Sequence, residues 1–285
     1  MEAFHFREWT IAYAHSGRGS PVVFLHNGGT SHAIWREVMP RVAERHEVFA
    51  LDLLGYGASS KPGSGYLMDT YVELLGAFVD EHSLAPVTLV GNCMGSAISL
   101  TFTRRRPSDV RQLVLINPLT AATLLAGQLG PLLRLERRAP KLAGKLHAFA
   151  ARSPLPGWLS RQAVRFQYGP LGRASEIAQE RELLSCMSTP TQIESMLAVL
   201  DDLESYRALD SFSPPPGFPP LATLWGLDNR VLSAKAGRKL NATLRPSRTE
   251  WVEGAGHLPM LEAPERVARF ISELIDAPAA GEPAA

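Results

Sequence analysis

The sequence contains only two cysteines, Cys93 and Cys186, among 285 residues. Two cysteines so far apart cannot form a disulfide framework, and they lack the clustered spacing of a zinc site. We therefore expect a reduced, cytoplasmic protein that needs neither a metal nor another cofactor. No apolar run approaches the roughly 18 residues that a membrane span requires. The start of the chain mixes acidic and polar residues and does not resemble a signal peptide.

A large excess of charge of one sign is also missing. There are 29 Lys and Arg against 28 Asp and Glu, which gives a formal net charge of +1. Global electrostatics therefore give no reason to expect a nucleic acid or a membrane as partner. The 45% of hydrophobic and 20% of charged residues are ordinary for a globular protein and argue against long disorder. We expect a small-molecule substrate as the partner.

Short apolar runs alternate with longer helical patterns along most of the chain. The runs are rich in β-branched residues and bounded by turn residues, which predicts an α/β fold with a mostly parallel sheet and helices on both faces. The expected strands are 21–25, 48–51, 86–90, 110–116, 221–225 and 249–253. The expected helices are about 33–44, 68–81, 94–106, 233–243 and 264–275.

The alternation of strand and helix patterns stops in residues 119–213, which are helix-like and contain no convincing strand. A separate helical domain is one interpretation. We prefer an inserted cap, because strand–helix units flank the segment on both sides and must close into one sheet. The sequence thus predicts a core of residues 1–118 and 214–276, with a disordered tail, 277–285, that is rich in Ala and Pro.

The motif Gly91-Asn-Cys93-Met-Gly95 follows one expected strand and opens a helix. A nucleophile at such a tight turn needs small residues two positions before and after it, to avoid collisions with the neighbouring strand and helix. Thiolate attack is well precedented, so Cys93 is the candidate nucleophile. The alternative is a buried structural cysteine in a lapsed active site, or a receptor that kept the fold without turnover. Cys186 is expected to serve packing.

Two later loops also follow expected strands and supply candidate partners. His257 lies in the Gly-rich loop Gly254-Ala-Gly-His257 and is the candidate base, while Asp228 is the candidate acid that orients it. The order Cys93, Asp228, His257 matches one hydrolase class and neither main serine-protease order. Loops after parallel strands meet at the carboxyl edge of the sheet, where ligands usually bind.

The turn His26-Asn27-Gly28 ends the first expected strand. The backbone N–H groups of Gly28 and Met94 are the expected oxyanion donors. His26 is expected to brace its loop by hydrogen bonds, and Asp52, in a Gly-rich turn, is expected to be structural.

With these motifs the chain resembles the α/β-hydrolase superfamily over essentially residues 3–276. The resemblance rests on His26-Asn-Gly28, on Asp52-x-x-Gly-x-Gly-x-Ser59, on the turn around Cys93, on Gly226-x-Asp228 and on Gly254-x-Gly-His257. It implies an eight-stranded, mostly parallel sheet, a cap inserted after the sixth strand, and the triad Cys93, His257 and Asp228. Most members have Ser at the position of Cys93; dienelactone hydrolases and polyhydroxyalkanoate synthases use Cys, and members with Asp there, such as haloalkane dehalogenases, are disfavoured.

The expected cap is basic and apolar. Between Leu119 and Arg173 nine basic residues face one acid, Glu136, and the nine are Arg134, Arg137, Arg138, Lys141, Lys145, Arg152, Arg161, Arg165 and Arg173. They form either a solvated surface or a docking site for something acidic, such as an acyl carrier protein or coenzyme A. Asn27, Trp158 and Phe166 are candidate substrate contacts.

The sequence therefore predicts an acyl-enzyme catalyst, namely a thioesterase, esterase or acyltransferase. Two alternatives stay open: a non-catalytic small-molecule receptor on the same fold, and a C–C bond hydrolase or lyase, since fold alone does not fix the reaction.

Overall fold

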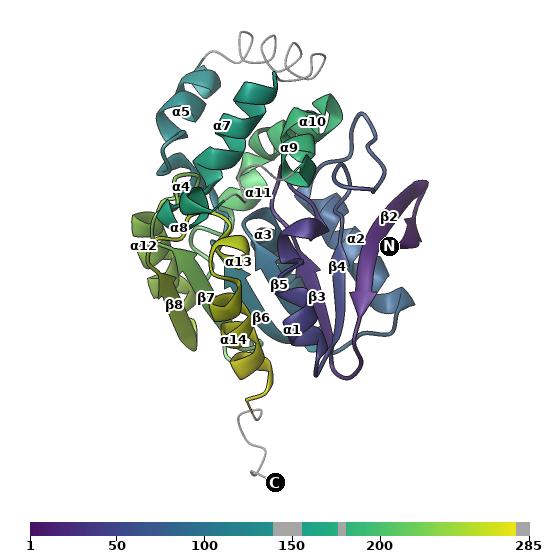
Figure 1. Ribbon diagram of the computed structural model, residues 1–285. Helices are drawn as coiled ribbons and strands as arrows, with labels where there is room; N and C mark the ends of the chain where they lie inside the picture. The colour runs from purple at the N-terminus through teal and green to yellow at the C-terminus, as the bar shows by residue number, and fades with distance from the viewer. Residues whose placement is uncertain (139–155, 176–180, 278–285) are drawn as a thin grey trace.

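The computed structural model describes residues 1–138, 156–175 and 181–277, and eight strands in these ranges form one sheet (Figure 1). The spatial order is β1-β2-β4-β3-β5-β6-β7-β8; β2 runs antiparallel to β1 and β4, and all other neighbours are parallel. This confirms the expected fold class. The strands are β1 (Glu2–Phe6), β2 (Trp9–Ser16), β3 (Pro21–Leu25), β4 (Glu47–Leu51), β5 (Val87–Asn92), β6 (Val110–Ile116), β7 (Leu221–Gly226) and β8 (Arg248–Val252).

The helices expected in the core are present, with one exception. The core helices are α1 (Met39–Ala43), α2 (Met68–Glu81), α3 (Met94–Arg105), α12 (Ala234–Leu244), α13 (Pro259–Glu262) and α14 (Pro264–Ile275), with 3-10 turns η1 (His32–Trp35) and η2 (Pro107–Asp109). The single helix expected over 33–44 is wrong, because η1 and α1 replace it. Pro40 lies in the first turn of α1, where its missing N–H costs nothing, whereas in the middle of a longer helix it would remove a hydrogen bond.

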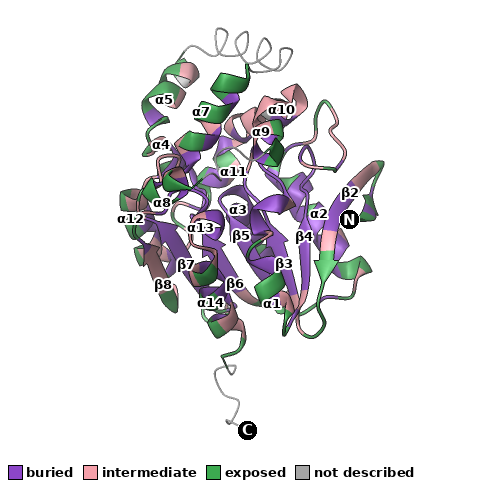
Figure 2. Ribbon diagram, viewed as in Figure 1, coloured by how far each residue is buried: buried purple, intermediate pink, exposed green. Residues whose placement is uncertain are grey.

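The sheet buries both of its faces, as a parallel sheet requires (Figure 2). In β3, Val23 and Leu25 belong to a core cluster shared with α2 and α3, whereas Val22 and Phe24 belong to a second cluster shared with α1 and α14. This period of two follows from the alternation of side chains along a strand.

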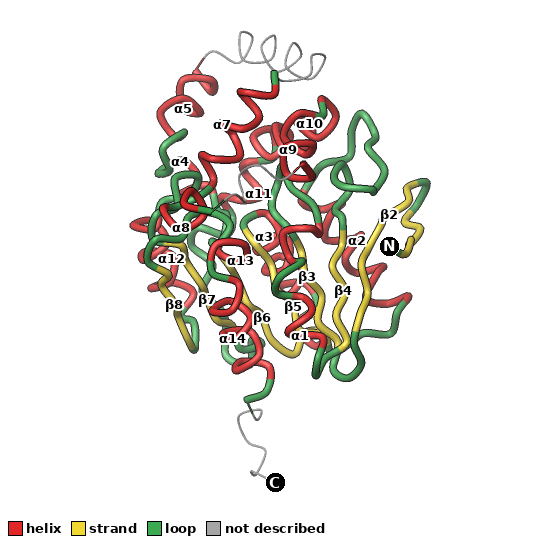
Figure 3. The backbone as a smooth tube through the Cα atoms, viewed as in Figure 1, coloured by secondary structure: helices red, strands yellow, loops and turns green. Residues whose placement is uncertain are grey.

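Between β6 and β7 the described residues form helices only, which gather at one end of the sheet (Figure 3). They are α4 (Ala121–Leu125), α5 (Gly130–Arg138), α7 (Gly157–Gln167), α8 (Pro170–Ala174), α9 (Arg181–Ser188), α10 (Pro190–Asp201) and α11 (Leu203–Arg207). We call this helical insertion the cap. The boundaries at 118/119 and 213/214 stay predictions, and all of the expected tail except residue 277 lies outside the described residues. No helix in the described part of the chain is long and apolar enough to cross a membrane.

Candidate active site

Cys93 occupies the tight turn between β5 and α3 that its motif predicts. It has a left-handed φ of 52° with ψ of −109°, and it is the N-cap residue of α3. A Cβ on Gly91 would lie 2.4 Å from the backbone of Gly95, and a Cβ on Gly95 would lie 2.2 Å from the carbonyl oxygen of Leu25. The two glycines therefore allow the strand, the turn and the helix to approach closely enough to present the thiol.

Gly95→Ala is expected to lower the free energy of unfolding by about 3 kcal/mol or more, because the new methyl group meets backbone that cannot move aside. Urea denaturation measures the change. Gly63→Ala is the matched control: nothing lies within 4 Å of its added Cβ, so a change below about 0.5 kcal/mol is expected. Equal stability of the two variants would contradict the close approach.

The thiol faces a cavity of about 390 Å³ between the sheet edge and the cap. Gly28 and Met94, the two residues expected to supply oxyanion N–H groups, line the same cavity as Cys93 and His257. Burial raises the pKa of Cys93 to about 12, although the Met94 N–H acts in the opposite direction. The remaining lining is mostly apolar and consists of Leu119, Leu124, Leu129, Leu133, Ala163, Phe166, Gln167, Met187, Met196, Leu197, Val199, Leu200 and Val231.

His257 reaches the cavity from the loop after β8, and its backbone is held on both sides. Its N–H donates to the carbonyl of Gln167 at 2.6 Å, and its carbonyl accepts from the side-chain amides of Asn92 and Asn117 at 3.3 and 3.2 Å. Burial lowers the pKa of the ring to about 3, so the imidazole is neutral at physiological pH. Within the described chain, no hydrogen bond joins this ring to the Cys93 thiol. The structure brings the two groups to one cavity, and their catalytic roles stay predictions.

The expected contact between Asp228 and the imidazole is not formed. The carboxylate of Asp228 instead accepts the N–H of Gly254 at 2.9 Å. The neighbouring residue, Asn229, places its side-chain amide 3.1 Å from Nδ1 of His257. Consecutive residues of this turn point in different directions, so that the acid faces the loop backbone and the amide faces the ring.

The three expected substrate contacts have different fates. Phe166 lines the cavity. Trp158 is 63% exposed and is not part of the lining. It lies eight positions before Phe166 on α7, so the two side chains point in directions about 80° apart around the helix axis. Asn27 is buried and is not part of the lining; its amide donates to Gln167 and its Oδ1 accepts from Asn92. Asn27 thus positions other residues and does not face the cavity.

His26 and Asp52 brace the loops beside the site, as expected from the sequence. The Nδ1–H of His26 donates to the carbonyl of Asn27 at 2.7 Å, and its Nε2 accepts the N–H of Leu53 at 2.9 Å. The buried carboxylate of Asp52 accepts from both the backbone and the ring of His32. These contacts confirm structural roles for both residues.

Sequence analysis missed the contribution of Glu262, in α13. Its carboxylate accepts the N–H of Gly256 in the histidine loop, at 2.8 Å, and those of Gly169 and Gly172 in the cap, at 2.8 and 3.2 Å. Burial raises its pKa, while these backbone donors act in the opposite direction. The position of an acid five residues after His257 was visible, but its two partners in the cap lie about 90 residues away in sequence.

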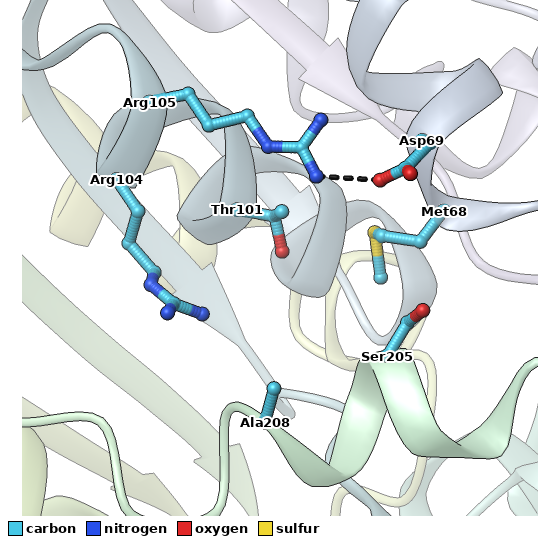
Figure 4. Close-up of a pocket in the computed structure, with 7 residues that line it drawn as sticks. All are labelled: Met68, Asp69, Thr101, Arg104, Arg105, Ser205 and Ala208. Atoms are coloured by element: carbon cyan, nitrogen blue, oxygen red, sulfur yellow. Dashed lines mark hydrogen bonds and ion pairs between the residues drawn. The ribbon is translucent and has the colours of Figure 1, made fainter.

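A second hollow lies away from Cys93, between α2, α3 and α11 (Figure 4). An ion pair joins Arg105 and Asp69, two of the residues that line it. Its lining contains neither a cysteine nor a histidine, so the cavity at Cys93 is the candidate active site.

A family model described as "alpha/beta hydrolase fold" matches residues 20–264, and the chain therefore belongs to this family. It is 28% identical to 2-hydroxy-6-oxo-2,4-heptadienoate hydrolase from Pseudomonas putida, over 92% of this chain and 91% of that protein. A haloalkane dehalogenase from Agrobacterium fabrum is 37% identical over 118 residues, 41% of this chain and 38% of that protein. Among solved structures, a thermophilic esterase from Thermogutta terrifontis matches with a TM-score of 0.77 at 20% identity, over 94% and 93% of the two chains, which shows the shared fold.

Proposed function

We propose that this α/β-fold hydrolase cleaves uncharged, apolar esters or thioesters, with Cys93 as nucleophile. One observation carries the proposal: Cys93 and His257 open into a single cavity whose described lining contains no side chain of Asp, Glu, Lys or Arg. An acyl chain buried there gains the free energy of removing apolar surface from water, whereas a carboxylate would be buried without a partner.

The chemistry follows the positions of the groups. The sulfur of Cys93 forms a bond to the carbonyl carbon, and the N–H groups of Met94 and Gly28 stabilise the oxyanion. The bond to the leaving alcohol or thiol then breaks, and the thiol proton reaches that group through His257. Water next attacks the acyl-enzyme, which releases the acid and restores the thiol.

A C–C bond hydrolase is the second candidate, because the Pseudomonas putida relative is named as the hydrolase of a keto acid that contains no ester bond. The same attack on a ketone would begin the reaction. The name of that relative denotes a carboxylate substrate, and the described lining in this chain offers no cation to pair with one. We therefore favour the neutral ester.

The basic cap belongs to a separate proposal, that an acyl carrier protein or coenzyme A delivers the acyl group. Arg134, Arg138, Arg161 and Arg165 are exposed on α5 and α7, which supports it. Lys141, Lys145 and Arg152 lie outside the described residues. Weaker turnover of a carrier-linked thioester at high salt is the result that this proposal requires.

A pair of esters of equal length tests the proposed substrate class. p-Nitrophenyl hexanoate should be hydrolysed with a kcat/KM about 100-fold higher than the p-nitrophenyl monoester of adipic acid, because burying an unpaired carboxylate costs several kcal/mol. Release of p-nitrophenolate measures both rates. Equal rates, or preference for the anionic ester, would contradict the proposal. Stabilisation by the ester without turnover would instead indicate a receptor.

A further inference from the structure

The side-chain amide of Asn229 can adopt only one orientation. Its Oδ1 accepts the backbone N–H groups of Val231 and Leu232, both at 3.0 Å. Exchanging the oxygen and nitrogen of the amide would point its NH₂ group at two N–H donors, which cannot accept it. The NH₂ group is therefore fixed toward Nδ1 of His257, at 3.1 Å.

This orientation determines which ring nitrogen carries the proton. An amide NH₂ group only donates, so Nδ1 of His257 must accept and must itself be unprotonated. The ring is neutral in its buried position, and its single proton must therefore reside on Nε2. Because Nδ1 faces Asn229, Nε2 is the nitrogen left for the cavity that His257 lines together with Cys93.

We infer that Asn229 is the positioning residue of His257 and holds it as the Nε2–H tautomer, so that the resting imidazole offers a proton donor, not a base, to the cavity. This inference rests on the proposed function for its catalytic meaning. To accept the proton of the Cys93 thiol, the ring must first carry its own proton on Nδ1, against the NH₂ group of Asn229. In serine proteases, changing the acid beside the histidine to its amide keeps the geometry but lowers turnover roughly 10⁴-fold, because the wrong tautomer is favoured.

The native chain is therefore a restrained catalyst with an unreactive thiol at rest. The nearby acid does not relieve the restraint, because the carboxylate of Asp228 is bound to the N–H of Gly254. Asn229→Asp changes one group and should relieve it. One carboxylate oxygen would keep the Val231 and Leu232 donors, and the other would accept Nδ1–H and favour the base-competent tautomer.

The tautomer itself is measured by long-range ¹H–¹⁵N correlation spectra of protein labelled with ¹⁵N-histidine, with His257→Gln to identify the signal. We expect an unprotonated Nδ1 in the native chain and in Asp228→Asn, and a protonated Nδ1 in Asn229→Asp. A protonated Nδ1 in the native chain would overturn the inference. If Asn229→Asp does not fold, the native spectrum still decides.

Reactivity gives a second measurement. Alkylation of Cys93 by iodoacetamide at pH 7, followed by intact mass, should be at least about tenfold faster in Asn229→Asp, and turnover of p-nitrophenyl hexanoate should rise about 100-fold. Unchanged alkylation in a folded variant would refute the tautomer assignment. If neither protein hydrolyses any ester while alkylation and spectra change as expected, the proposed function fails and the inference stands.

Discussion

Cys93→Ala should lower turnover of p-nitrophenyl hexanoate at least about 10³-fold, because it removes the atom that we propose forms the acyl-enzyme. The proposed oxyanion donors and the cavity stay in place in this variant, so binding of the ester should be retained. A coupled measurement is the intact mass of the native protein after a short ester pulse, which should increase by one acyl group located on Cys93. The matched control is Cys186→Ala. Cys186 is also buried and free, but it does not line the cavity, and its replacement should change turnover less than about threefold.

Substantial turnover by Cys93→Ala would show that water attacks the substrate directly. Absence of turnover in the native protein, together with unchanged ligand-induced stabilisation in Cys93→Ala, would indicate the non-catalytic receptor. The two results differ, so a single set of proteins separates the acyl-enzyme route from direct attack by water and from the receptor.

The second large effect concerns stability as a function of pH. Burial lowers the pKa of His26 to about 4 and that of His257 to about 3, whereas both titrate near 6.5 in the unfolded chain. Below pH 6.5 the unfolded state therefore binds more protons than the native state, and stability falls as pH falls. Together these residues should remove about 4 kcal/mol from the free energy of unfolding between pH 8 and pH 5. Urea denaturation at several pH values measures this change.

His257→Gln should reduce that loss by about half, while His5→Gln, at an exposed position, should leave it unchanged. His32 acts in the opposite sense. Burial lowers its pKa and the bond to Asp52 raises it, with a net increase, so its contribution is present below pH 6.5 and is lost as pH rises through the folded value. A stability that is flat, or that increases from pH 8 to pH 5, would contradict neutral burial of His26 and His257.

The central part of the fold was predictable because its signals are local. The strands from Pro21 to Gly226 are mostly short apolar runs, and the glycines around Cys93 are required by one tight turn. The hairpin of β1 and β2 was not identified from the residues, since β1 lies at the sheet edge and alternates between exposed and buried positions without an apolar run. These two strands were expected only because the resemblance to the α/β-hydrolase superfamily implies eight strands in total.

The partner of His257 could not be predicted for a different reason. Asp228 and Asn229 are adjacent, and chemical precedent favoured the carboxylate. Which of the two faces the ring depends on the backbone of the turn, and this is set by contacts with Ala255 and with the N–H groups of Val231 and Leu232. No sequence pattern encodes the geometry of these contacts.

The cap is not an interchangeable module, because the loop that carries His257 is fastened to it. Glu262 binds Gly169 and Gly172 in the cap as well as Gly256, and the backbone of His257 donates to Gln167. Excising the insertion, or grafting a foreign lid onto this sheet, would remove two donors from the buried carboxylate of Glu262 and would remove the carbonyl of Gln167 that accepts the His257 N–H. A functional chimera must therefore inherit residues 167–172 and 254–262 as a single unit.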